Sequence, residues 1–175
     1  YQVCLNQLND TSEPVSILID NCRSEQNAYG TSLIVARRGR YPKGEVRYRN
    51  CVFKEEKRFG IGFEKKPAGA VDVIFEKCAL ERVGSADKAD EPDVLMYPPM
   101  WDDGLPGNVF FDDLKIIQRG KKPWIGASRR TFGERAKDFR GKVTVIAADG
   151  TIEHVKVDDA MMAELFPLAE GDSPY

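Results

Sequence analysis

Val46-Arg-Tyr-Arg-Asn-Cys-Val-Phe53 is the stretch that decides the fold, because its pattern recurs along the chain. Apolar residues alternate with variable ones, and a turn-type or polar residue then precedes Cys or Leu. The same pattern occurs in Ile17–Cys22, Val73–Leu80 and Val109–Ile116. The Cys or Leu positions of the four units are 29, 27 and 36 residues apart. Self-similarity with a period of about 20–50 residues is typical of stacked structural repeats.

A second, fainter repeat alternates with the first. It consists of short apolar runs at Thr31–Val35, Gly60–Phe63, Val94–Tyr97 and Pro123–Gly126, and Val3–Leu5 has the spacing of the same run in an earlier coil. Short runs rich in β-branched and aromatic residues with period-two alternation predict strands. We therefore expect coils of two or three short strands, stacked so that their apolar sides form one continuous core.

The alternation also predicts which side chains point inward. Val46, Tyr48 and Cys51 fall on the inner side, and Arg47 and Arg49 fall on the outer side. The bend between the two parts of each unit carries Asn21, Asn50, Lys77 and Asp113, and Asn tolerates the left-handed backbone of a sharp bend. Three of the four cysteines share one phase of the repeat, which predicts a single interior column of unbridged, buried thiols formed by Cys22, Cys51 and Cys78.

The repeat resembles that of right-handed parallel β-helix proteins. The residues that carry the resemblance are Ile17-x-Ile19-x-Asn21-Cys22, Val46-x-Tyr48-x-Asn50-Cys51-x-Phe53 and Val73-x-Phe75-x-Lys77-Cys78-x-Leu80, and the pattern covers about residues 3–127. The group includes pectate and alginate lyases, polygalacturonase-like hydrolases, phage tailspikes and adhesins. The resemblance implies an all-β, right-handed parallel β-helix (solenoid) of about four coils and an extracellular or periplasmic protein. No catalytic motif of one family is present to be carried over.

After Trp124 the repeat is lost, so we divide the chain into coils at residues 1–127 and a C-terminal extension at residues 128–175. Residues 128–141 are interpreted as a basic loop or short helix. Lys142–Ala147 and Ile152–Val157 flank an Asp149-Gly150 turn, which predicts a β-hairpin. Asp158–Phe166 is predicted to be a short helix that begins at an acidic residue. The hairpin and the helix are expected to cap the coils at their C-terminal end. The chain is interpreted as the C-terminal part of a longer solenoid. The remainder of that chain, or another subunit, is expected to cover the first coil.

Composition narrows the range of partners. The 175 residues are 42% hydrophobic and carry a net charge of −2, which fits one domain and gives no reason to expect a nucleic-acid partner. The chain contains no run of 18 apolar residues, so no membrane span is predicted, and no signal peptide is visible. The chain has no CxxC pair, and its single histidine is His154, a residue interpreted as a solvent-facing strand position. We therefore expect no metal site and no cofactor; clustered acids allow calcium, but the spacing of an EF-hand is absent.

The outer side of the predicted strands carries two notable columns. Asp20, Arg49 and Glu76 are expected to form an ion ladder across three coils. Arg47 shares its column with Leu18, Ile74 and Phe110. An outward apolar column is expected to be covered by the tail after Lys142 or by another chain, or to serve as a sugar- or partner-binding face.

The candidate site lies in the long interruption Gly84–Gly107 and in the basic segments around it. Tyr97, Trp101, Asp102 and Asp103 combine aromatic surface with carboxylates, which suits a sugar ring. Asp102 and Asp112 are the pair that we would test as hydrolase carboxylates, because glycosidases place two about 5–10 Å apart. Arg37, Arg38 and Arg47 are predicted to bind an acidic polysaccharide, with an affinity that falls as salt rises.

These features favour a polysaccharide-binding or polysaccharide-modifying protein, either a lyase or a hydrolase. The alternative is a non-catalytic structural or adhesin-like module.

Overall fold

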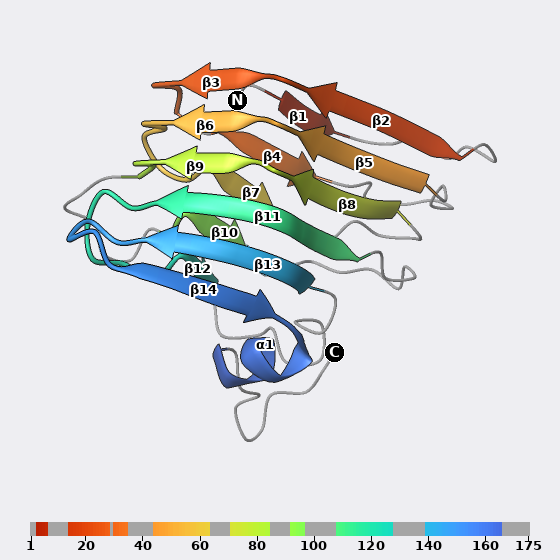
Figure 1. The fold of residues 1–175 in the computed structure, drawn as a ribbon. Helices are drawn as coiled ribbons and strands as arrows, with labels where there is room; N and C mark the ends of the chain where they lie inside the picture. The colour runs from red at the N-terminus through yellow and green to blue at the C-terminus, as the bar shows by residue number, and fades with distance from the viewer. Residues whose placement is uncertain are drawn as a thin grey trace.

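The computed structural model describes residues 3–6, 14–28, 30–34, 44–63, 71–84, 92–96, 108–127 and 139–165. They form a mainly β structure with one short C-terminal helix (Figure 1). The smaller sheet is entirely parallel and contains β1 (Val3–Asn6), β4 (Thr31–Ile34), β7 (Ile61–Phe63), β10 (Val94–Met96) and β12 (Ile125–Ala127). The second, fainter repeat is therefore confirmed as a series of strands, each of which pairs with its counterpart in the next repeat.

The larger sheet has two rows of strands that lie end to end. The first row contains β2 (Val15–Asp20), β5 (Gly44–Arg49) and β8 (Val71–Glu76), and the second contains β3 (Arg23–Glu25), β6 (Val52–Lys54) and β9 (Ala79–Glu81). β11 (Val109–Ile117) runs through both rows, since its first half pairs with β8 and its second half with β9. Figure 1 shows the two rows stacked in front of the smaller sheet. This arrangement is consistent with the predicted parallel β-helix.

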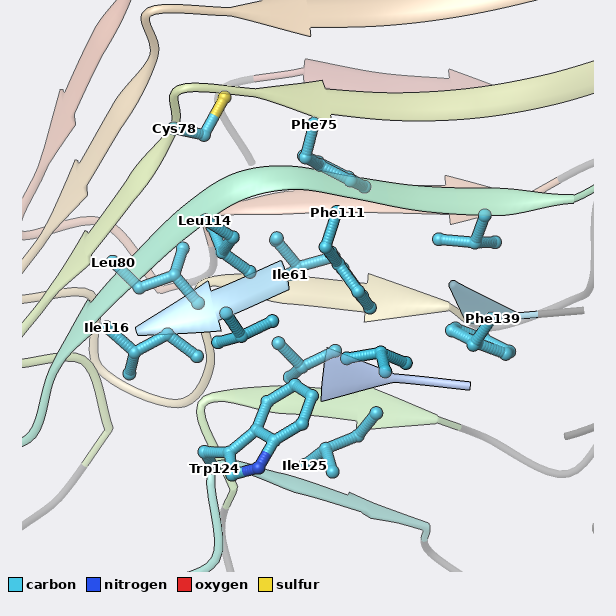
Figure 2. Close-up of a cluster of buried hydrophobic side chains, with 14 of the residues drawn as sticks. Ile61, Phe75, Cys78, Leu80, Phe111, Leu114, Ile116, Trp124, Ile125 and Phe139 are labelled. Carbon is cyan, nitrogen blue, oxygen red and sulfur yellow. The ribbon is translucent and has the colours of Figure 1, made fainter. Parts of the chain in front are cut away.

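Strict alternation along the first row builds the core. Tyr48, Phe75 and Phe111 occupy one register position in β5, β8 and β11, and all three are fully buried. The rings of Tyr48 and Phe75 stack at 4.9 Å between centroids, and those of Phe75 and Phe111 lie 6.0 Å apart. Each such pair contributes about 0.5–1.5 kcal/mol beyond its area burial. Figure 2 shows Phe75 and Phe111 above one another, with Phe139 and Trp124 continuing the apolar cluster. The predicted inward positions are thus confirmed.

The bend between the two rows has the same backbone geometry in four repeats. Asn21, Asn50, Lys77 and Asp113 have φ values of 53°, 53°, 50° and 63°. The backbone N–H of each of the first three donates to a carbonyl in the following repeat, at 2.7–3.0 Å. The stacking of the bend therefore rests on backbone hydrogen bonds, and the left-handed geometry persists where Asn is replaced by Lys or Asp.

The thiols of Cys22, Cys51 and Cys78 form the predicted column, and all three are free. Cys51 Sγ donates to the carbonyl of Ile19 and Cys78 Sγ to that of Tyr48, both at 3.4 Å, so the thiols link successive repeats. The thiols of Cys51 and Cys78 are buried, whereas that of Cys22 is half-buried.

The C-terminal region extends the sheet as well as capping it. β13 (Phe139–Ile146) pairs in parallel with β11 across both rows, with a register shift between Phe111 and Leu114. Our interpretation of Phe139–Gly141 as loop or helix is therefore wrong. The sequence does not indicate the start of this strand, because basic residues and glycine surround Phe139, which is the one inward apolar side chain there. Gly141 stands opposite Phe111 and has a φ of 128°. A Cβ on Gly141 would lie 2.0 Å from the Phe111 carbonyl oxygen.

The predicted hairpin and helix are confirmed. β14 (Ile152–Val157) is antiparallel to β13, and α1 (Asp159–Leu165) follows it. The side chain of Asp158 accepts a hydrogen bond from the backbone N–H of Met161, which caps the start of the helix. Met162 is fully buried and joins the core below β13, so this end of the stack is closed (Figure 1).

Candidate functional site

Two of the predicted site residues lie in the described part of the chain. Asp112 is exposed at the end of the first half of β11, and Arg47 is half-buried in β5. Arg37, Arg38, Tyr97, Trp101, Asp102 and Asp103 lie outside the described residues. The separation of the Asp102 and Asp112 carboxylates, and the aromatic sugar platform, thus stay predictions.

The outer side of the first row lies within the described residues. We define the outer face as the outward side chains of β2, β5, β8, the first half of β11 and Arg140. The strand register places them in three columns that run across the strands. Those columns are Ser16–Glu45–Asp72–Asn108, Leu18–Arg47–Ile74–Phe110–Arg140 and Asp20–Arg49–Glu76–Asp112.

Arg47 is held by two carboxylates on this face. Its guanidinium donates to Glu45 through Nε at 2.7 Å and Nη2 at 3.1 Å, and to Glu76 through Nη1 at 2.8 Å. The hydrogen bonds to Glu45, and then those to Glu76, raise the pKa of Arg47. The guanidinium charge of Arg47 is therefore already balanced within the protein.

Arg49 pairs with Asp20 but not with Glu76, so the expected three-residue ladder is only half formed. Nε and Nη2 of Arg49 reach the two oxygens of Asp20 at 3.0 and 2.6 Å. These hydrogen bonds lower the pKa of Asp20. Glu76 stands opposite Arg49 in the register, yet it contacts Arg47 on the diagonal. Diagonal neighbours are within the reach of a long side chain, and register alone does not choose between the two partners.

The middle column of the outer face keeps apolar surface in contact with solvent. Leu18 is 54% exposed, and Ile74 and Phe110 are half-buried. We expected the tail after Lys142 to be one possible cover. Residues 142–165 instead lie at the C-terminal end of the stack, where β14 and α1 pack against β13. Within the described residues, the tail therefore leaves Leu18 uncovered.

Sequence reasoning missed a buried ion pair between the two sheets. The side chains of Asp93 and Lys122 are 0% and 3% exposed, and Lys122 Nζ lies 3.0 Å from Asp93 Oδ1. This approach is close enough for an ion pair but is not aligned as a hydrogen bond. Lys122 Nζ also donates to the Val83 carbonyl at 2.8 Å, and Gln118 Nε2 donates to Asp93 Oδ2 at 3.0 Å. Burial raises the pKa of Asp93, against the opposing effects of Lys122 and Gln118.

The Asp93 cluster has a structural role in this fold. The backbone carbonyl of Asp93 accepts a hydrogen bond from Gly60 at 3.0 Å, and Lys122 binds the carbonyl that precedes Gly84. The pair thus links the residues that precede β7 and β10 to the bend that follows β9. Neither partner follows the repeat pattern, so no spacing in the sequence indicates that they meet.

A second buried polar group lies between the first two repeats. Ser24 donates to Glu56, and Asn27 Nδ2 donates to the Ser24 hydroxyl at 2.9 Å. Glu56 is fully buried, and its Oε2 has no partner among the described residues. The sequence does not indicate that these polar residues point inward, because they interrupt the apolar pattern by which inward positions are recognised.

The cysteines and the histidine do not form a reactive centre in the described part of the chain. Burial raises the pKa of Cys51, and it raises the pKa of Cys78 to about 12. His154 is exposed on β14, with Nδ1 3.2 Å from the Thr144 hydroxyl, which confirms the solvent-facing position. Across the described ranges, His, Cys, Asp and Glu side chains form no group of three that could hold a metal ion.

Comparison with known proteins gives no relative: no protein-family model, curated protein or solved structure matches this chain. In the described residues no helix is long and apolar enough to cross a membrane.

Proposed function

We propose that this chain is a right-handed parallel β-helix module that binds a polysaccharide along its outer face. The observation that carries the proposal is the column of Leu18, Arg47, Ile74 and Phe110. It places partly exposed apolar groups in three of four consecutive strands, with Arg47 in the remaining one, between two columns of charged and polar side chains. Adjacent strands lie about 4.8 Å apart, so the column repeats at short, regular intervals along the stack.

Such a column suits a chain of sugar rings. A pyranose ring has an apolar surface of C–H groups and a rim of hydroxyls, so it needs apolar contact in the middle and hydrogen-bonding groups at the sides. The outer face supplies the first through Leu18 and Phe110. It supplies the second through carboxylates in both flanking columns and through the guanidinium of Arg49 in one of them, and charged groups make stronger hydrogen bonds than neutral groups.

The proposal is a binding function, and catalysis is a separate claim. Asp112 is exposed and lies at the edge of the outer face, so it is open to a bound polymer. Hydrolysis by Asp102 and Asp112 is tested by replacing each with Asn and measuring release of reducing ends. A binding module would retain polymer binding and show no turnover in any variant.

The binding proposal is tested by electrophoresis through gels that contain a dissolved polysaccharide, followed by calorimetry. Leu18→Asp places a charge in the middle of the apolar column and is expected to weaken binding at least tenfold. Ile152→Asp is the matched control, because Ile152 is 58% exposed on β14, away from the outer face. Equal binding by the two variants would contradict the proposal, and absence of binding to any glycan would favour a structural module.

A further inference from the structure

The charges of the outer face indicate which class of polysaccharide it selects. We infer that it binds an uncharged polysaccharide in preference to a polyuronate. This inference rests on the proposed function. The expectation from the basic segments of the sequence is the reverse, a preference for acidic polymers.

The two central arginines are not free to bind carboxylates of a ligand. Arg47 is shared between Glu45 and Glu76, and Arg49 forms a two-point contact with Asp20. Two-point contacts between a guanidinium and a carboxylate have the best geometry available to this pair. A uronate that approached either guanidinium would find its charge already balanced and would lie beside the paired carboxylates, which would repel it.

The third arginine at this face is also paired. Arg140 Nη1 lies 2.6 Å from Asp159 Oδ1, which brings a further carboxylate from the start of α1. On the outer face itself, the guanidinium groups are Arg47, Arg49 and Arg140, and the carboxylates are Asp20, Glu45, Asp72, Glu76 and Asp112. The carboxylates outnumber the guanidinium groups, and the net charge of the described face is negative.

A negative face disfavours a polyanion at low salt. Screening by salt acts over about 10 Å at 0.1 M, and neighbouring strands are about 4.8 Å apart. Several carboxylates of the outer face would therefore repel a bound polyuronate at the same time. The repulsion would diminish as salt is added, which is the reverse of the behaviour of a basic binding site.

Pairing leaves hydrogen-bond donors for hydroxyl groups. A guanidinium has five N–H donors, and the hydrogen bonds of Arg47 and Arg49 on this face use three and two of them. The remaining donors are carried by groups whose charge is balanced. Together with the apolar column, they form a surface that recognises hydroxyls and C–H groups without requiring an acidic ligand.

The inference is tested by measuring the affinity of the full chain for a soluble neutral glucan, for alginate and for pectate, at low and at high salt. The neutral glucan is expected to bind with an affinity that does not change with salt. Alginate and pectate are expected to bind at least tenfold more weakly at low salt and to gain affinity as salt rises.

A double variant, Glu45→Gln with Glu76→Gln, removes both partners of Arg47. It is expected to gain at least tenfold in alginate affinity at low salt, because the guanidinium charge becomes available. Glu153→Gln on β14 changes the charge away from the outer face and is expected to leave alginate affinity within twofold. Circular dichroism confirms that each variant is folded.

The outcomes separate the inference from the proposed function. Tight binding of alginate or pectate that weakens with salt would overturn the inference and keep polysaccharide binding. Binding of none of the three polymers would overturn both. Binding of the neutral glucan that is lost in Leu18→Asp, together with weak alginate binding, would support both.

Discussion

At the scale of single residues, the ion pair of Asp93 and Lys122 is almost completely buried. Lys122→Met keeps much of the apolar stem and removes the charge. Removing one partner of a buried ion pair typically costs about 3–5 kcal/mol, because the other charge remains buried without compensation. We expect Lys122→Met to lower the free energy of unfolding by that order, as measured by urea denaturation at neutral pH.

Lys156→Met is the matched control for this prediction. Lys156 also forms an ion pair, with Asp158 at 2.9 Å, but its side chain is 81% exposed. Exposed pairs contribute little to stability, so the control should unfold at nearly the wild-type urea concentration. Equal losses in the two variants would show that the Asp93 pair is not buried in solution.

The Cys78 thiol gives a prediction about alkaline pH. Its pKa is raised from 9.0 to about 12 by burial, so the unfolded chain loses this proton at a lower pH than the folded protein. Above pH 9 the folded state therefore binds more protons, and stability falls as pH rises towards 12. Urea denaturation across this interval should show a flatter decline for Cys78→Ala than for the wild type. Parallel declines would contradict burial of the thiol.

At the scale of elements, the pairing of β13 with β11 depends on the absence of a side chain at Gly141. A Cβ there would lie 2.0 Å from the carbonyl oxygen of Phe111, in a backbone with φ of 128°. We expect Gly141→Ala to separate the two strands locally and to lower the melting temperature by several degrees, measured by circular dichroism.

Gly150→Ala is the control, because Gly150 also has a positive φ, at 88°, but a Cβ there would meet nothing within 4 Å. Its cost should be confined to the backbone strain of a positive φ, about 1–2 kcal/mol. A melting temperature for Gly141→Ala that is no lower than that of Gly150→Ala would show that β11 and β13 are not closely paired.

The elements also show which features of the fold could be predicted from the sequence. The alternation in Val46–Phe53 predicted the buried side chains and the cysteine column correctly, because each inward position repeats in the next strand. It missed the first three residues of β13 and the pairing of β13 with β11, because glycine and basic residues interrupt the pattern there. It also assigned Glu76 to Arg49, since register defines opposite neighbours and the reach of the side chain decided for Arg47. The meeting of Asp93 with Lys122 depends on bends that do not repeat, so it could not be derived from spacing.

At the scale of the whole molecule, the two ends of the stack differ. At the C-terminal end, Met162 and Val157 are buried beneath β13. At the other end, Ile17, Ile19 and Cys22 are only partly buried, whereas their counterparts Val46, Tyr48 and Cys51 in the next repeat are at most 2% exposed. Stability in a stack of repeats comes largely from neighbours on both sides.

This difference predicts a gradient in native-state hydrogen exchange. Amides of β8 and of the first half of β11 should exchange slowest, because each of these strands has a paired strand on both sides. Amides of β2 and β3 should exchange faster, as each pairs with a single strand among the described elements. Exchange in β2 as slow as in β8 would indicate that another segment or another molecule covers this end.

The reversed direction of β14 has a consequence for assembly. Among the described strands, those above β14 in Figure 1 run parallel to their neighbours, and β14 alone is antiparallel to its partner. A second molecule that approached this end in the same orientation would meet a strand of opposite polarity, and the parallel ladder could not continue across the contact. Head-to-tail stacking of this kind is how open filaments grow. β14 thus ends the run of parallel strands at this end, and a further molecule in that orientation could extend the sheet there only by antiparallel pairing.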